Sequence, residues 1–235
     1  MKAFAITLTA LACCVAAGGK ALPLEYGVKM GFNLAQHYGP KADETVYKVE
    51  TGMRPGLTGG AFLNYRILDE VRLGYELLYS MKGSREKITI LSMDGEILPK
   101  PAVMSVRYDL DYLEVPIDLR LRTFSTDNFA LETIAGTAMS YKIHGHHELD
   151  GKVYIPDGEG FAEFPIHEES DLATVNQFDY SFIYGMAAQY RGKLKLDAEL
   201  RFTLGWDYLS LPTFSLEDPA VLRNQCYSLC LGMQF

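Results

Sequence analysis

Charged residues occupy every second position over much of the segment from residue 193 to residue 208. Similar rows, in which both signs are interleaved, come earlier in the chain. Such rows could hold an acid and a base for catalysis, or line a path for ions. Packed together away from water they would pair instead, because an unpaired buried charge is costly. We expect pairing among Arg72, Glu76, Lys82, Glu114, Asp118, Arg120, Arg122, Glu132, Lys142, Lys193, Lys195, Asp197, Glu199, Arg201 and Asp207.

Histidines gathered in one stretch form a second candidate site. Imidazoles and carboxylates bind Zn²⁺ and similar cations when three or four of them meet in one small sphere. The spacing here matches no defined metal site, and a solvated outer loop is the preferred interpretation. The residues concerned are His144, His146 and His147, with His167, Glu168 and Glu169 further along.

The segment that carries the longest charged row has the pattern of a β-strand. From Lys193 to Tyr208 its even positions are apolar and its odd positions are mostly charged. Successive side chains of a strand point to opposite faces, so one face is apolar and the other ionic. A helix would give no coherent apolar stripe. Sixteen residues is long for a strand of a soluble sheet.

Alternation of this kind recurs in eight segments, and the connections between them alternate between long and short. An up-and-down membrane barrel with short periplasmic turns and long outer loops has this pattern. The long connections are 36–53, 84–104, 144–175 and 209–223, and the short ones are 67–70, 124–128 and 191–192. The predicted strands are 24–34, 55–66, 71–82, 106–122, 129–143, 177–190, 193–208 and 226–235.

The fourth predicted strand contains an irregularity. Its apolar positions change phase by one residue at Tyr112 and Leu113, and Pro116 follows. A β-bulge shifts the phase in this way, and proline is tolerated near bulges because it cannot donate to the ladder. We therefore predict a bulge in this strand.

A soluble eight-stranded barrel such as a lipocalin would have its apolar face inside, and this alternative stays open. Three features favour lipid outside: a length of 11–16 residues for most strands, a carboxyl-terminal strand that ends on its apolar face at Phe235, and aromatic residues near both strand ends. We expect one rim to carry Tyr26, Tyr65, Phe129, Tyr190 and Phe235, and the other Tyr79, Tyr108, Tyr141, Phe178, Tyr180, Trp206 and Tyr208.

The amino-terminal residues resemble a secretory signal. Lys2 precedes an apolar run and small residues follow, which predicts a signal peptide over 1–21 and a barrel domain over 22–235. An uncleaved anchor and a lipoprotein signal at Cys13 or Cys14 are the alternatives. The whole chain has a net charge of −8, which argues against a nucleic-acid partner. Cys226 and Cys230 are four residues apart on one predicted strand, too far to bridge each other, and we expect them to face the lumen.

The sequence Tyr112–Ile117 (YLEVPI), followed by Leu119 and Leu121, resembles the signature of PorT-like outer-membrane β-barrel proteins. The resemblance extends over the mature chain, from Gly27–Asn33 (GVKMGFN) to the terminal Phe235. It implies an integral outer-membrane protein of a Gram-negative cell, inserted by the general barrel machinery through the strand that ends in Phe235. It supplies no set of catalytic positions.

The expected function is non-enzymatic. We predict an all-β, eight-stranded antiparallel transmembrane barrel in the outer membrane, with a periplasmic amino terminus and a lumen closed by ion pairs. Its partners would be outer-membrane lipids, the insertion machinery and proteins that the outer loops contact. No catalytic, cofactor-binding or metal-binding residue is expected, since no glycine-rich phosphate loop, Cys-x-x-Cys pair or nucleophile elbow occurs. A small pore and a lipid A-modifying enzyme are the alternatives.

Overall fold

The computed structural model describes residues 24–39, 47–93, 96–157, 160–172, 176–206, 209–210 and 221–235. The predicted signal peptide, residues 1–21, lies outside these ranges, as do Asp207 and Tyr208. Among the described residues, no helix is both long and apolar enough to span a bilayer.

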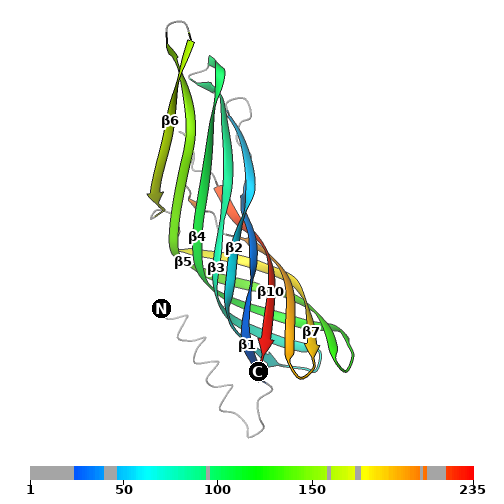
Figure 1. Cartoon of the computed structure of the whole chain (residues 1–235). Coiled ribbons are helices and arrows are strands. Elements are labelled where there is room, and N and C mark those ends of the chain that lie inside the picture. Colours follow the sequence, from blue (N-terminus) through cyan, green and yellow to red (C-terminus); the bar gives the residue numbers. More distant parts are fainter. Residues whose placement is uncertain are drawn as a thin grey trace.

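Antiparallel strands make up nearly all of the described chain. Eight of them close into a ring in the order β1-β2-β3-β4-β5-β7-β8-β10, and β10 pairs again with β1 (Figure 1). The predicted eight-stranded up-and-down barrel is therefore confirmed. β6 adds to β5, and β9 adds to β10. The strands are β1 (Leu24–Tyr38), β2 (Tyr47–Arg66), β3 (Val71–Met93), β4 (Glu96–Ser125), β5 (Phe129–Asp157), β6 (Gly160–Asp171), β7 (Phe178–Arg191), β8 (Lys195–Gly205), β9 (Leu209–Ser210) and β10 (Val221–Gln234).

The two faces of the ring have the chemistry of a membrane barrel. Met30 and Phe32 on β1 are 72% and 69% exposed. Lys29, which directly precedes Met30 in the strand, is buried. The same alternation continues around the ring, with Leu200 exposed and Glu199 buried on β8. A soluble barrel would bury the apolar row and expose the charged one. The alternative of a lipocalin-like barrel is therefore wrong.

The ring has one end at which the chain turns tightly, called here the turn end. Residues 67–70, 126–128 and 192–194 connect neighbouring strands there. The described chain enters at this end through β1 and leaves it through β10 (Figure 1). Two of these turns are closed by backbone hydrogen bonds, from Ile67 N–H to Val71 O and from Thr126 N–H to Phe129 O.

Aromatic side chains gather outside both ends of the ring, as predicted. At the opposite end, Tyr79, Leu113, Tyr141 and Phe178 stand in one cross-strand row. The rings of Tyr141 and Phe178 are 5.4 Å apart. Trp206 stacks on Phe182 at 5.1 Å nearby, and the turn end exposes Tyr26, Phe129, Tyr190 and Phe235.

Four strands, β2, β3, β4 and β5, continue past the aromatic row that contains Tyr79 and Tyr141. They continue with β6 as a long sheet that projects away from the ring (Figure 1), called here the protruding sheet. It comprises residues 47–56, 81–93, 96–112, 144–157 and 160–171. Residues 96–112 alone extend about 50 Å at the usual rise of a strand. Much of the predicted connections 36–53, 84–104 and 144–175 is therefore strand, and their assignment as loops was wrong.

The protruding sheet has the opposite polarity from the ring. On β4, the inward row remains unbroken from Ala102 through Tyr112 to Arg120, and every second residue is buried. Its members are apolar as far as Tyr112, and Glu114 is the first charged one. The apparent phase shift at Tyr112 and Leu113 is thus a change of environment, from lipid outside to water outside. The predicted bulge lies at this level but in the neighbouring strand, where Ile143 of β5 is the extra residue.

A compact apolar cluster forms inside the protruding sheet. Met104, Val106, Leu110 and Tyr112 of β4 contribute most of it. Tyr108 belongs to this cluster and is 3% exposed, so its predicted place in the outer aromatic girdle is wrong. The remaining buried members are Ile88, Leu149 and Leu172.

The strands change geometry where the ring meets the protruding sheet. β2 has a register shift between Met53 and Thr58 against β3. On β3, Gly83 has a φ of 130°, a conformation that side chains with a Cβ rarely adopt. A Cβ at Gly83 would also stand 1.9 Å from the Tyr108 carbonyl oxygen. Glycine is therefore required at this junction.

Replacing Gly83 with alanine is expected to destabilise the protein by roughly 1–3 kcal/mol, the usual cost of a strained backbone residue. Urea unfolding of refolded protein, followed by the fluorescence of Trp206, the only tryptophan, would measure it. Gly52→Ala is the matched control, because the nearest atom to a Cβ there is 3.5 Å away. Equal unfolding midpoints for the two variants would contradict the requirement for glycine at residue 83.

Candidate functional site: the lumen and the protruding sheet

Seven charged side chains from four strands fill the middle of the ring, called here the central lattice. They are buried, and opposite signs alternate. An eight-stranded ring is just wide enough for its own side chains to fill, so these groups must satisfy one another. The members are Lys29, Glu76, Asp118, Arg120, Asp197, Glu199 and Arg201.

Glu76 is the centre of the central lattice. Its Oε1 accepts from Lys29 Nζ and from Arg120 Nη2, each at 2.7 Å. Arg201 adds two parallel bonds of 3.0 Å to the two carboxylate oxygens, the bidentate geometry that guanidinium favours. One carboxylate thus joins three cations that stand on three different strands.

Glu199 joins the same three cations from the other side. Its carboxylate lies 3.0 Å from Lys29 Nζ and 3.1 Å from Arg120 Nη2, and it also pairs with Arg201. Asp118 accepts from Arg120 Nε at 2.9 Å. The predicted pairing of the charged rows is confirmed for these residues.

A second polar layer closes the ring toward the protruding sheet. Lys82 is ion-paired with Glu114, which also accepts from Ser140 at 2.9 Å. Asn224 donates to Tyr112 Oη at 3.2 Å and to Asp179 at 2.8 Å. A cavity bordered by Lys82, Glu114 and Arg201 measures only about 10 Å³, close to the smallest volume that admits one water molecule.

A third polar layer lies at the turn end. Arg72 is buried and pairs with both Glu25 and Glu132. Arg66 donates to Glu25 at 2.6 Å, and Arg122 Nε lies 3.8 Å from Glu132. Arg66, Arg122, Arg191 and Lys195 line the rim of this layer.

Several residues of the predicted rows do not join the lumen pairs. Lys142 donates to the Leu172 carbonyl oxygen at 2.5 Å, and Lys193 and Lys195 are exposed at the turn end. Asp207 lies outside the described residues. Cys226 and Cys230 face inward, buried and unbridged, as predicted.

A histidine, a serine and a glutamate meet under the protruding sheet, a grouping that sequence reasoning missed. His37 Nδ1 lies 2.7 Å from Ser84 Oγ and 3.8 Å from Glu86 Oε1, and all three side chains are buried. His37 is far from Ser84 in sequence, and the β1–β2–β3 pairing alone brings them together. The sequence offered one signal for this grouping: Ser84 and Glu86 are two residues apart, so on a strand their side chains point to the same face.

The geometry of this grouping differs from that of a hydrolase triad. In a triad the nucleophile and the carboxylate bind opposite nitrogens of the imidazole. Here Ser84 and Glu86 lie on the same nitrogen, and Ser84 is 0% exposed. The ring of His37 packs against Tyr108 at 5.5 Å. This arrangement serves as a polar contact within the core.

The β5–β6 hairpin carries the histidines and acids predicted in a loop, and it places His167 beside Glu148 and Asp150, two acids outside the predicted set. Asp150 pairs across the strands with His167, and Glu148 with Glu169. The His167 ring nitrogen is 2.7 Å from Asp150 Oδ1, and this bond raises the pKa of His167. The donor atoms of Glu148, Asp150 and His167 lie within 4.8 Å of one another. Such exposed clusters are common on protein surfaces without a metal.

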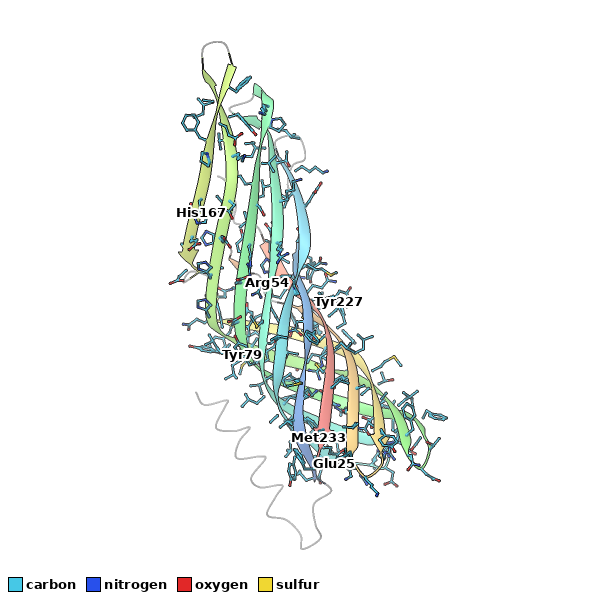
Figure 2. All side chains as sticks on the ribbon, in the orientation of Figure 1. Glu25, Arg54, Tyr79, His167, Tyr227 and Met233 are labelled. Atoms are coloured by element: carbon cyan, nitrogen blue, oxygen red, sulfur yellow. The ribbon has the colours of Figure 1, made fainter. Side chains whose placement is uncertain are left out.

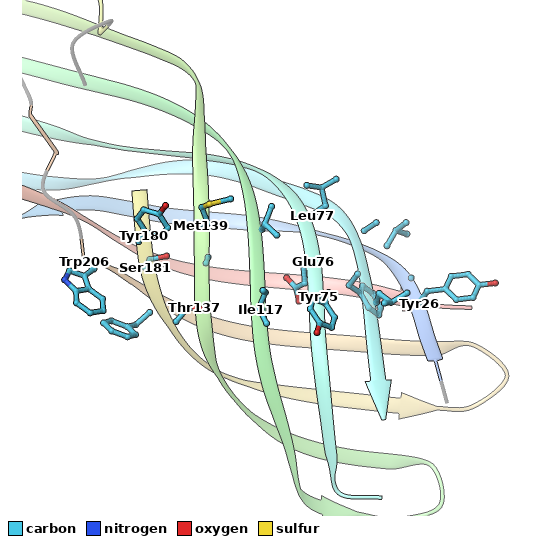
Figure 3. Close-up of a pocket in the computed structure, with 18 of the residues that line it drawn as sticks. Tyr26, Tyr75, Glu76, Leu77, Ile117, Thr137, Met139, Tyr180, Ser181 and Trp206 are labelled. Atoms are coloured by element: carbon cyan, nitrogen blue, oxygen red, sulfur yellow. The ribbon is translucent and has the colours of Figure 1, made fainter. Parts of the chain in front are cut away.

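A broad apolar hollow lies on the outside of the ring (Figure 3). Tyr26, Leu77, Ile117, Met139 and Trp206 line it with outward-facing side chains. These side chains belong to the outward-facing apolar rows of the ring, called here the apolar belt. The hollow is therefore part of the surface that faces the bilayer interior.

Comparison with known proteins identifies this architecture. A family model described as outer membrane protein beta-barrel domain matches residues 16–207. The chain belongs to this family. No curated protein matches the sequence. The family, the inverted polarity and the aromatic rims together place the protein in the outer membrane of a Gram-negative cell.

Solved structures of outer-membrane barrels resemble the family member described here at low identity. Ail, the attachment invasion locus protein of Yersinia pestis, has 12% identity and a TM-score of 0.36, covering 90% of this chain and 98% of that one. The outer membrane protease OmpT from Escherichia coli has 9% identity and a TM-score of 0.49, covering 90% and 96%. OprG from Pseudomonas aeruginosa has 10% identity and a TM-score of 0.35, covering 91% and 97%.

Membership of the family orients the molecule. Bacterial outer-membrane barrels have short turns on the periplasmic side, so the turn end faces the periplasm. The protruding sheet then stands outside the cell. Phe235 N–H donates to the Tyr26 carbonyl oxygen at 2.8 Å, which closes the ring at the periplasmic rim.

Proposed function

We propose that this protein is a non-enzymatic surface receptor or adhesion module, anchored by a closed barrel and binding other proteins through its protruding sheet. The free edge of β6 is the observation that carries the proposal. β6 pairs only with β5 in the described part of the chain, and most of its described side chains are exposed. The edge stands at the outer border of the sheet (Figures 1 and 2).

An uncovered strand edge presents a row of unpaired N–H and C=O groups. An extended segment of another protein can add to such an edge as a further strand, so that backbone hydrogen bonds supply affinity and side-chain contacts supply specificity. The acidic residues of β6 disfavour pairing of this edge with an identical copy, because like charges repel. Pro165 has the same effect because it has no N–H to donate. The acids are Glu163, Glu168, Glu169 and Asp171. The same charges favour a partner segment rich in lysine or arginine.

The narrower resemblance to PorT-like proteins belongs to this proposal. The YLEVPI segment lies in β4 where the ring meets the protruding sheet. A role in assembly at the cell envelope would use the same edge, with the partner being another envelope protein. In both cases the barrel anchors the protein in the membrane and catalyses no reaction.

The proposal is tested by placing the photo-crosslinking residue p-benzoylphenylalanine at Phe164 of β6, which is 48% exposed. Irradiation of intact cells in their native medium should give adducts of defined mass, identifiable by mass spectrometry. Tyr184, 54% exposed on the lipid belt, is the matched control and should give no protein adduct. Reversing charge with Glu168→Lys and Glu169→Lys should reduce the Phe164 adduct roughly tenfold, the effect of about 1.4 kcal/mol. Adducts unaffected by this reversal would contradict edge recognition.

The two alternatives have direct tests. Steady unitary conductance of the purified protein in planar bilayers would favour a pore. We expect no such conductance, because the polar layers fill the lumen. A change in lipid A mass on overexpression, lost in Ser84→Ala, would favour an enzyme. We expect lipid A of unchanged mass, because Ser84 is buried and Glu86 does not approach the second nitrogen of His37.

A further inference from the structure

A cavity of about 160 Å³ opens in the periplasmic mouth of the barrel, called here the mouth cavity. Four cations from four strands line it: Arg66 of β2, Arg122 of β4, Arg191 of β7 and Lys195 of β8. Glu25 is the only carboxylate among its lining residues. The volume suits one compact chemical group and is below that of typical pockets for larger ligands.

The charges around the mouth cavity do not balance. Glu25 is already bound by Arg66 and by Arg72, and Glu132 is bound by Arg72 and lies 3.8 Å from Arg122 Nε. The lining groups and their direct ion-pair partners thus include five cations and two carboxylates. The central lattice, by contrast, holds three cations and four carboxylates. The excess of positive charge is local to the mouth, in a chain whose net charge is −8.

The three arginines that line the mouth cavity also carry unused donors. Arg66 Nε, Arg122 Nε and Arg191 Nη2 are buried and have no hydrogen-bond acceptor in the described structure. Buried polar groups are nearly always hydrogen-bonded, and an exception calls for a missing partner. Other donors of these guanidinium groups are bonded: Arg122 donates to Asp69 O at 2.8 Å, Arg66 to Glu25 at 2.6 Å and Arg191 to Ser125 Oγ at 3.5 Å. The donors are therefore fixed in position and unsatisfied together.

We infer that the mouth cavity binds an oxyanion of the phosphate class, presented by the headgroup of a phospholipid with a net negative charge in the periplasmic leaflet. Guanidinium groups match phosphate oxygens in geometry and charge. The lining also includes Tyr190 and Leu196, which are 51% and 46% exposed on the lipid-facing side of β7 and β8. One wall of the cavity is thus cationic and the other belongs to the apolar belt. A headgroup can reach the arginines while its acyl chains stay against that belt.

The first experiment uses inorganic phosphate as the probe and neutral detergent in place of lipid. The thermal midpoint of the refolded protein is measured against phosphate concentration at constant ionic strength, with chloride as the balancing anion. The midpoint should rise saturably in the unmodified protein. Arg122→Gln and Arg191→Gln should each weaken the apparent dissociation constant by about tenfold or more, as expected for the loss of a charge-assisted hydrogen bond.

Arg107→Gln is the matched control, because it removes the same charge from an exposed position on the protruding sheet, where the side chain is 45% exposed. It should leave the phosphate response unchanged. Lys195→Gln, at an exposed lining position, gives a second variant that does not depend on a buried contact. Heat-modifiable gel migration verifies that each variant folds.

The second experiment distinguishes the source of the phosphate. In nanodiscs of phosphatidylcholine alone, inorganic phosphate should still raise the midpoint. In nanodiscs that contain phosphatidylglycerol, the midpoint should already be high, and added phosphate should have little further effect. Phosphate that acts equally in both kinds of disc would identify a free anion as the ligand and overturn the headgroup assignment. No effect of phosphate or of phosphatidylglycerol, or an equal effect in Arg191→Gln, would overturn the oxyanion site itself.

Discussion

Replacing Arg120 with alanine is expected to destabilise the folded barrel by about 3–5 kcal/mol, the usual result of removing one partner from a buried ion network. Arg120 contacts Glu76 at 2.7 Å, Asp118 at 2.9 Å and Glu199 at 3.1 Å, and its side chain is 1% exposed. Without it, the central lattice would hold four carboxylates and only Lys29 and Arg201. Urea titration of protein folded into lipid vesicles, followed by Trp206 fluorescence, would measure the loss.

Arg107→Ala is the control for this change. Arg107 is 45% exposed and pairs only with Asp109, at 3.0 Å, among the described ion pairs. Exposed pairs of this kind contribute about 0–1 kcal/mol, so the unfolding midpoint should hardly move. If both variants lost a similarly small amount of stability, the lumen charges would be well hydrated. That result would contradict the description of the central lattice as a buried, mutually paired network.

The second large effect is expected at the lipid face. Leu200→Arg should cost roughly 2–4 kcal/mol of barrel stability, because it places a charge near the middle of the bilayer. Leu200 is 59% exposed and faces outward between Met186 and Leu229 on the neighbouring strands. The same vesicle titration measures the cost, and repetition in bilayers of different thickness would confirm its dependence on depth.

Val103→Arg provides the comparison at a different height. Val103 also faces outward and is 40% exposed, but it stands on the protruding sheet, outside the aromatic rim. Surface changes of this type usually alter stability by about 0.5 kcal/mol or less. If Leu200→Arg were as mild as Val103→Arg, the apolar belt of the ring would not face lipid.

Most of the ring could be predicted from the sequence, because one face of each strand meets lipid and the other meets the lumen. This demand makes hydrophobicity alternate with a period of two over nearly every strand. At β8, Glu199 and Leu200 occupy the predicted faces. The pairing of the lumen charges followed from the size of an eight-stranded ring, since side chains with nowhere else to go must satisfy one another.

The protruding sheet was missed for a related reason. Its segments carry glycine, proline and charged residues that are typical of loops, and its apolar row belongs to the opposite face. Tyr108 was therefore assigned to the lipid side, although it is inside. The contact of His37 with Ser84 depends on register between β1 and β3, which alternation does not encode. The mouth cavity likewise depends on how four strand ends meet in space.

The continuity of β4 through the membrane surface has a mechanical consequence. One strand of 30 residues runs from the outer tip of the protruding sheet to the periplasmic side without a loop. In an antiparallel sheet the hydrogen bonds lie perpendicular to the strands. A pull on the outer tip therefore acts along the strands and loads many bonds of the β3, β4 and β5 ladders at once, in shear. Tension applied by a bound partner would be distributed into the barrel wall instead of opening the sheet one bond at a time.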